Sequence, residues 1–147
     1  MKHLLRCTLA LLASLLIAMP ASAADLFVNV LTGGTSGVYY PLGVALANNI
    51  GKSLPAAKTS VQATKASVEN LILVQAGRGE IALTLGDSVS DSWQGNEEAG
   101  FKTPLKGLRT VAGIYPNYIQ IVASAESGIK TLADLKGKRI SVGAPRS

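Results

Sequence analysis

Short apolar runs alternate along the chain with segments of helical periodicity. Residues 26–31 (Leu-Phe-Val-Asn-Val-Leu) have the length and composition of a mostly buried strand. Apolar residues then recur at every fourth position, which marks one face of a helix that begins near Val38. Gly51 is expected to end this helix, because glycine readily adopts the left-handed conformation that follows a last turn. The pattern predicts a strand–loop–helix unit over residues 26–51.

Two further units of the same kind follow. A shorter strand over residues 59–63 precedes a helix over 68–76, for which Ser67 is a natural N-cap. A nearly continuous apolar run over 80–85, typical of a central parallel strand, precedes a short helix over 88–93. Successive strand–loop–helix units imply a parallel sheet flanked by helices, with right-handed crossovers. The predicted fold class is therefore α/β.

The remainder of the chain is predicted to contain one polar loop and more strands. Residues 94–106 are polar and contain glycine and proline, which favours a surface loop. A short helix over 131–135 is capped by Thr131. The three further strands are expected over residues 108–114, 118–123 and 139–143.

Glycine and hydroxyl residues gather where the predicted strands end, in loops 33–37, 64–67 and 86–88. The carboxyl ends of parallel strands share one edge of the sheet, where ligands of α/β proteins bind. The helix N-termini at that edge present free N–H groups, which favour an anion such as a carboxylate or a phosphate. The residues expected to contribute to this site are Gly33, Gly34, Thr35, Ser36, Gly37, Tyr39, Lys65, Ser67 and Asp87.

Structural roles are equally open for several of these residues. The loop 33–37 also fits an ordinary tight turn between a strand and a helix. Asp87 is either a contact for a ligand amino group or cation, or an N-cap of the next helix. Ser67 is first a cap and second a ligand donor, and Lys65 has the alternative of a solvated loop lysine.

Residues 1–23 have the three parts of a secretory signal peptide. Lys2 and Arg6 give a positive start, residues 9–19 are apolar, and residues 21–23 (Ala-Ser-Ala) form a small-residue cleavage signal. We therefore expect cleavage before Ala24 and a periplasmic location.

The composition after the signal excludes several classes of function. The 14 Lys and Arg residues less Lys2 and Arg6 leave twelve against nine Asp and Glu, so the net charge is only +3. Scattered cations and this mild charge give little support to nucleic-acid binding. Because His3 and Cys7 both lie in the signal, a disulfide scaffold, a Cys/His zinc site and a histidine triad are excluded. No cofactor or metal is expected.

Four segments, in this order, resemble the TAXI family, the periplasmic solute-binding subunits of TRAP transporters. They are residues 32–43 (TGGTSGVYYPLG), 63–70 (ATKASVEN), 86–87 (GD) and 127–145 (SGIKTLADLKGKRISVGAP). The resemblance implies a two-lobed, type II periplasmic-binding-protein fold that holds a small solute between its lobes. It further implies a carboxylate or amino-acid-like solute, anionic or zwitterionic, and delivery to TRAP membrane permease subunits driven by an ion gradient. It implies no catalysis.

The resemblance also has implications for domain organisation. Members of the family are roughly twice as long, as two lobes of ordinary domain size require. We therefore expect an N-terminal fragment in which the second lobe is largely missing: a signal peptide over residues 1–23, ligand-binding lobe one over 24–123, and the crossover and start of lobe two over 124–147. Tyr115 or Tyr118, which flank Pro116, would wall the cleft at the lobe junction. The family usually has a glycine pair where this chain has Lys65 and Ala66.

Two other classes of function stay open at this point. One is a non-transporting sensor or partner-binding lobe. The other is an enzyme that uses Asp87 and a serine, whose general base would have to be a carboxylate, a lysine or a tyrosine. A binding protein leaves its solute unchanged, whereas an enzyme turns it over.

The signal peptide can be tested directly. We expect the intact mass of protein recovered from a periplasmic extract to correspond to a chain that begins at Ala24. A retained Met1, or material confined to the cytoplasm, would contradict the expectation.

Overall fold

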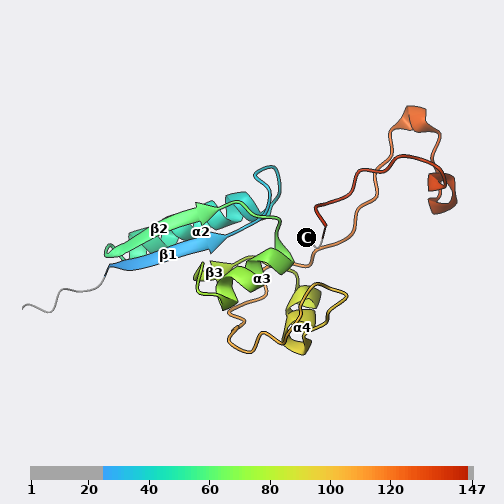
Figure 1. Ribbon diagram of the computed structural model, residues 1–147. Helices are drawn as coiled ribbons and strands as arrows, with labels where there is room; N and C mark the ends of the chain where they lie inside the picture. Colours follow the sequence, from blue (N-terminus) through green and yellow to red (C-terminus); the bar gives the residue numbers. More distant parts are fainter. Residues whose placement is uncertain (1–24, 146–147) are drawn as a thin grey trace, which may run out of the picture.

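The computed structural model describes residues 25–145, so the predicted signal peptide lies outside the described residues. Three parallel strands form a sheet in the order β2-β1-β3 (Figure 1). The strands are β1 (Leu26–Leu31), β2 (Ala57–Gln62) and β3 (Ile81–Ala82). The α-helices are α2 (Tyr39–Ser53), α3 (Ser67–Gln75) and α4 (Gly86–Gln94). Two short 3₁₀ helices follow, η1 (Ala125–Ser127) and η2 (Leu132–Leu135). The α/β class, with a parallel sheet flanked by helices, is confirmed. No helix in this part of the chain has the length and apolarity needed to cross a membrane.

The first core lies between α2 and the β1–β2 pair. Val28 and Val30 of β1 point to the same face because side chains alternate along a strand, and both pack with Ala47 of α2. Asn29 points to the other face, where its amide nitrogen donates to Gln62 Oε1 at 3.0 Å. One face of this pair is thus apolar and covered by α2, and the other carries Asn29 between the exposed Phe27 and the fully buried Leu31.

Helix α2 runs past its predicted end. Gly51 lies inside the helix, which ends at Ser53, and the N–H of Leu54 bonds to the Ile50 carbonyl at 2.8 Å. Gly51 does not have the positive φ that a left-handed cap requires. It faces Thr59 of β2 instead, so its small size serves packing against the sheet.

The second core lies between α3, α4 and the loop that follows them. Val68 and Leu71 of α3 pack with Phe101, which is only 2% exposed. The prediction of a surface loop over residues 94–106 is therefore wrong at Phe101, whose side chain is buried. A backbone hydrogen bond also holds this loop to α4, because the N–H of Leu105 donates to the Ser92 carbonyl at 2.8 Å.

The strands predicted after residue 107 are absent from the described structure. Residues 109–145, here called the arm, leave the helices and the sheet as extended chain, turn through η1 and η2, and lead back toward the body (Figure 1). The segments 108–114, 118–123 and 139–143 form no ladder, because a strand exists only where a neighbour pairs with its backbone. Strand β3 is likewise shorter than the predicted 80–85.

The cap at Thr131 is confirmed, although the helix is a 3₁₀ turn. Asp134 Oδ2 accepts the N–H of Thr131 at 2.8 Å and that of Lys130 at 3.0 Å, and Thr131 and Asp134 form a capping box. These bonds favour the ionised carboxylate and lower the pKa of Asp134.

Two glycines of α2 allow a matched test of how closely this helix packs on the sheet. A Cβ on Gly43 would lie 2.3 Å from Thr32 Cγ2, whereas one on Gly51 would lie no closer than 3.6 Å to Thr59. Gly43→Ala should therefore lower the free energy of unfolding by about 1–3 kcal/mol through overpacking. Gly51→Ala should raise it by up to about 1 kcal/mol, because alanine is the better helix former. Urea unfolding of both variants decides this, and an equal change in both would contradict close packing at Gly43.

Candidate functional site

The carboxyl ends of the three strands are tied together by one buried side chain, the amide of Asn70 on α3. Its Nδ2 donates to the Thr32 carbonyl after β1 at 2.6 Å and to the Leu83 carbonyl after β3 at 2.8 Å. Its Oδ1 accepts the hydroxyl of Thr64, after β2, at 2.6 Å. Asn70 is fully buried. The three loops predicted to form the site therefore start from fixed relative positions.

Two other buried hydroxyls complete this polar connection, which we call the strand-end network. Ser67 Oγ accepts the N–H of Leu85 at 3.1 Å, and Thr32 Oγ1 donates to the Gln62 carbonyl at 2.8 Å. Thr32 and Ser67 are both 0% exposed. Within residues 25–145, no buried side-chain nitrogen or oxygen lacks a partner, so burial of these groups carries little desolvation penalty.

Ser67 therefore has a different role from the predicted one. The residue before α3 with non-helical backbone is Ala66, and no side chain caps this helix. Ser67 is the first helical residue, and its hydroxyl points into the strand-end network. It supports the site from beneath and presents no hydroxyl to solvent.

Loop 33–37 lies directly against the loop that precedes α3. A Cβ on Gly33 would lie 3.4 Å from the Ala66 Cβ and 3.7 Å from the Tyr39 ring. Beyond Gly33 the loop is exposed, and the N–H of Gly37 bonds to the Gly34 carbonyl at 2.9 Å. The loop thus forms a tight turn at the start of α2 and leaves Thr35 and Ser36 facing solvent. Hydroxyls in such a loop are natural N-caps, but those of Thr35 and Ser36 do not cap α2, which has no side-chain cap.

The three helix N-termini at this edge differ in charge. Glu69 of α3 accepts the N–H of Lys65 at 2.7 Å, and Asp87 of α4 accepts the N–H of Ser88 at 2.6 Å. The first turn of α2 holds no acidic residue. Because a helix N-terminus attracts negative charge, α3 and α4 already carry an anion of their own, whereas α2 does not.

Tyr39, at the start of α2, links this edge to the arm. Partial burial raises the pKa of the Tyr39 hydroxyl, and its neighbours Tyr115 and Asp87 raise it further. The hydroxyl therefore stays protonated and can donate a hydrogen bond. Tyr115 belongs to the arm and Asp87 to α4, so groups from both segments act electrostatically on the Tyr39 hydroxyl.

Ala66 has a backbone conformation that alanine rarely adopts. Its φ is 72° and its ψ is −143°, and it is the only non-glycine residue with positive φ between residues 25 and 145. Its N–H bonds to Thr64 Oγ1 at 2.9 Å, and its carbonyl accepts the N–H of Asn70 at 3.0 Å. Such a conformation costs about 1–3 kcal/mol and persists only where surrounding contacts fix it.

The predicted residues thus have unequal places in the structure. Those that lie at the common edge with an exposed or half-buried side chain or backbone are Gly34, Thr35, Ser36, Gly37, Tyr39, Lys65, Asp87 and Tyr115. Gly33 and Ser67 are buried beneath them. Sequence reasoning gave no role to Asn70, although a polar side chain on the apolar face of a predicted helix was a usable signal.

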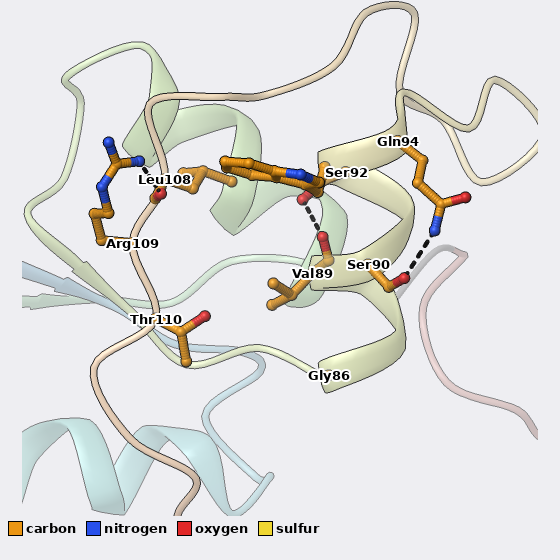
Figure 2. A pocket seen from close by; sticks show the side chains of 9 residues that line it. Gly86, Val89, Ser90, Ser92, Gln94, Leu108, Arg109 and Thr110 are labelled. Carbon is orange, nitrogen blue, oxygen red and sulfur yellow. Dashed lines mark hydrogen bonds between the residues drawn. The ribbon is translucent and has the colours of Figure 1, made fainter.

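A separate hollow lies beside α4, at the point where the arm begins. It has a volume of about 490 Å³, and Figure 2 shows Val89 and Ser90 of α4 on one side and Leu108 and Thr110 on the other. The guanidinium of Arg109 turns back to its own main chain and donates to the Leu108 carbonyl at 2.7 Å. We call this hollow the α4 groove.

A parallel sheet with helices on its flanks and polar loops at one edge is the architecture of a lobe of a periplasmic-binding-type protein. Comparison with protein families agrees, because the family model described as the NMT1-like family matches residues 30–147. The chain belongs to the NMT1-like family. It is accordingly a solute-binding-type protein whose ligand is a small molecule.

The strand-end network predicts a large effect of Asn70→Leu. Leucine has a similar volume but leaves the Leu83 carbonyl without its side-chain donor, and the Thr32 carbonyl keeps only the Thr64 hydroxyl, at 2.8 Å. Each buried unsatisfied group costs about 1–3 kcal/mol. We expect the free energy of unfolding to fall by about 3 kcal/mol in urea denaturation. The exposed Asn49→Leu in α2 is the control and should change it by less than about 0.5 kcal/mol. Similar small effects of both would contradict the central role of Asn70.

The strain at Ala66 predicts that glycine stabilises this position. Ala66→Gly relieves the strained conformation but adds the backbone entropy of glycine, so a net gain of about 1 kcal/mol is expected. Ala76→Gly, at the other end of α3, is the control, because Ala76 has an ordinary φ of −84°. It should destabilise the protein by about 0.5–1 kcal/mol. Thermal unfolding measures both, and a destabilising Ala66→Gly would show that the alanine conformation is not strained.

Proposed function

We propose that this protein is the solute-binding subunit of a TRAP-type transporter of the TAXI kind, exported to the periplasm, which captures a small carboxylate or amino-acid-like solute. It hands that solute, unchanged, to membrane permease subunits for uptake driven by an ion gradient. Membership of the NMT1-like family supports the general class. The motifs over residues 32–43 and 63–70 favour the narrower assignment.

One observation carries the choice of solute. Of the three helix N-termini at the site edge, only that of α2 lacks an acidic residue in its first turn. The exposed loop 33–37 gives a ligand access to it. An anionic group of the solute therefore binds there, where the helix dipole attracts it and the hydroxyl of Tyr39 can donate to it.

The opposite end of the solute meets a different environment. The Asp87 side chain is near Tyr39, and it forms no salt bridge within the described residues. A carboxylate in this position favours an ammonium group. The same site thus accommodates a zwitterionic solute whose carboxylate lies on loop 33–37 and whose amino group lies near Asp87.

The proposal is tested by a thermal-shift screen of carboxylates and amino acids, followed by calorimetry with each compound that raises the melting temperature. Mass spectrometry of the recovered solute then distinguishes binding from turnover. Stabilisation by one solute class, with the solute intact, is the expected result. Chemical conversion of the solute would support an enzyme instead, and stabilisation by none of the compounds would remove the proposed solute class.

A pair of variants tests the location of the site. A Cβ on Gly37 would lie 3.3 Å from the Gly34 carbonyl oxygen, so Gly37→Val should displace the turn and weaken solute binding about tenfold or more. Lys58→Ala is the control, because Lys58 lies at the amino end of β2 and pairs with Asp25. It should leave the affinity unchanged in calorimetry. Equal affinities of the two variants would place the solute elsewhere.

A further inference from the structure

Thr64, between β2 and α3, carries the hydroxyl with the most partners in the strand-end network. Its Oγ1 lies 2.6 Å from Asn70 Oδ1 and 2.8 Å from the Thr32 carbonyl oxygen. The main-chain nitrogen of Ala66 lies 2.9 Å from the same oxygen. Thr64 is therefore the residue at which the network meets the strained main chain of Ala66.

The single proton of this hydroxyl has one arrangement that satisfies all of these groups. A hydroxyl donates one hydrogen bond and accepts up to two, and the Ala66 N–H can only donate to it. The Thr32 carbonyl already accepts from Asn70 Nδ2 at 2.6 Å. Within residues 25–145 Asn70 Oδ1 has no other donor, so the Thr64 proton belongs there. A lone pair of the hydroxyl then remains for the Ala66 N–H.

The bond to Thr64 is the one that holds Ala66 at its positive φ of 72°. Rotation about φ moves the N–H of a residue relative to the chain that follows it, whereas the carbonyl stays with that chain. The bond from the Asn70 N–H to the Ala66 carbonyl would therefore survive a relaxed φ. A bond from the Lys65 N–H to Glu69 also spans this rotation, but it is exposed and water can replace it.

Ala66 in turn limits the space in which loop 33–37 begins. A Cβ on Gly33 would lie 3.4 Å from the Ala66 Cβ and 3.7 Å from the Tyr39 ring, so the start of the loop is enclosed between these two residues. Gly33 directly follows Thr32, whose carbonyl belongs to the strand-end network. A change of φ at Ala66 would move its Cβ relative to β1 and so remove one wall of this enclosure.

We propose that Thr64 is a positioning residue for loop 33–37. By accepting the Ala66 N–H, its hydroxyl holds Ala66 against Gly33 and sets the loop in one conformation before a solute arrives. A site that is ordered in advance binds more tightly, because binding then costs less conformational entropy. The effect on solute affinity rests on the proposed function, whereas the effect on the loop does not.

The first experiment needs no solute and compares Thr64→Val, which lacks the hydroxyl, with Thr64→Ser, which retains it. NMR measures hydrogen exchange at the Gly37 N–H, which bonds to the Gly34 carbonyl within the loop. We expect this exchange to be about tenfold faster in Thr64→Val and nearly unchanged in Thr64→Ser. Unchanged exchange in Thr64→Val would overturn the proposal.

Two further variants keep this result specific. Val28→Ala lowers the general stability through the first core, near the other end of β1, and should leave exchange at Gly37 unchanged. An equal effect of Val28→Ala would show that Thr64 acts only through overall stability. Should Thr64→Val not fold, as circular dichroism would reveal, Thr64→Cys takes its place, because a thiol is a weaker donor and acceptor.

A second substitution tests the route through Ala66. Glycine adopts a positive φ without strain, so Ala66→Gly should make the loop less dependent on Thr64. The faster exchange caused by Thr64→Val at Gly37 is therefore expected to be several-fold smaller when Ala66→Gly is also present. An equal increase with and without Ala66→Gly would exclude Ala66 as the residue through which Thr64 acts.

Calorimetry separates this inference from the proposed function. The probe is the carboxylate or amino acid that raises the melting temperature most in the thermal-shift screen. Thr64→Val should weaken its binding about tenfold, and Thr64→Ser should change it by less than about twofold. If the unmodified protein binds none of the compounds, the proposed function fails and the exchange measurements alone decide the role of Thr64. If Thr64→Val binds the probe as tightly as the unmodified protein does, the positioning role fails and the proposed function stands.

Discussion

The structure depends on one buried amide. Asn70 reaches from α3 to the ends of all three strand segments through three short hydrogen bonds, which a buried environment of low dielectric strengthens. Parallel strands are not joined by tight hairpins, and here the side chain of Asn70 adds a connection at their carboxyl ends to the hydrogen bonds of the ladder. Asn70 therefore helps to fix the positions of the loops that begin at the strand ends. These loops include the turn at Gly33 and the strained Ala66.

The electrostatics of the site follow from that arrangement. Three helices begin at one edge, and their N-termini would together attract several anions. Glu69 and Asp87 already lie at two of them, so of the three only the N-terminus of α2 has no acidic residue of its own. Under the proposed function, the attraction for an anionic group of the solute would come from this helix N-terminus and not from a buried cation.

The apolar side chains of the sheet and helices are packed into cores, whereas those of the arm are exposed to solvent. Two small cores, one on each side of the sheet region, bury Val30 and Phe101 almost completely. The arm contains equally apolar sequence, but within residues 25–145 its apolar side chains stay largely exposed. Large exposed apolar patches on proteins generally mark places of association.

The sequence by itself determined what depends on near neighbours. Strand 26–31, the alternation of strands and helices that makes the sheet parallel, and the Thr131 cap all rest on residues within a few positions of one another. Tertiary structure decided the rest. Phe101 became core within a polar loop because α3 presents an apolar face to it, and the strand predicted over 118–123 did not form because pairing requires a partner that local sequence cannot specify. The role of Asn70 was hidden for the same reason, since its partners lie up to 38 residues away.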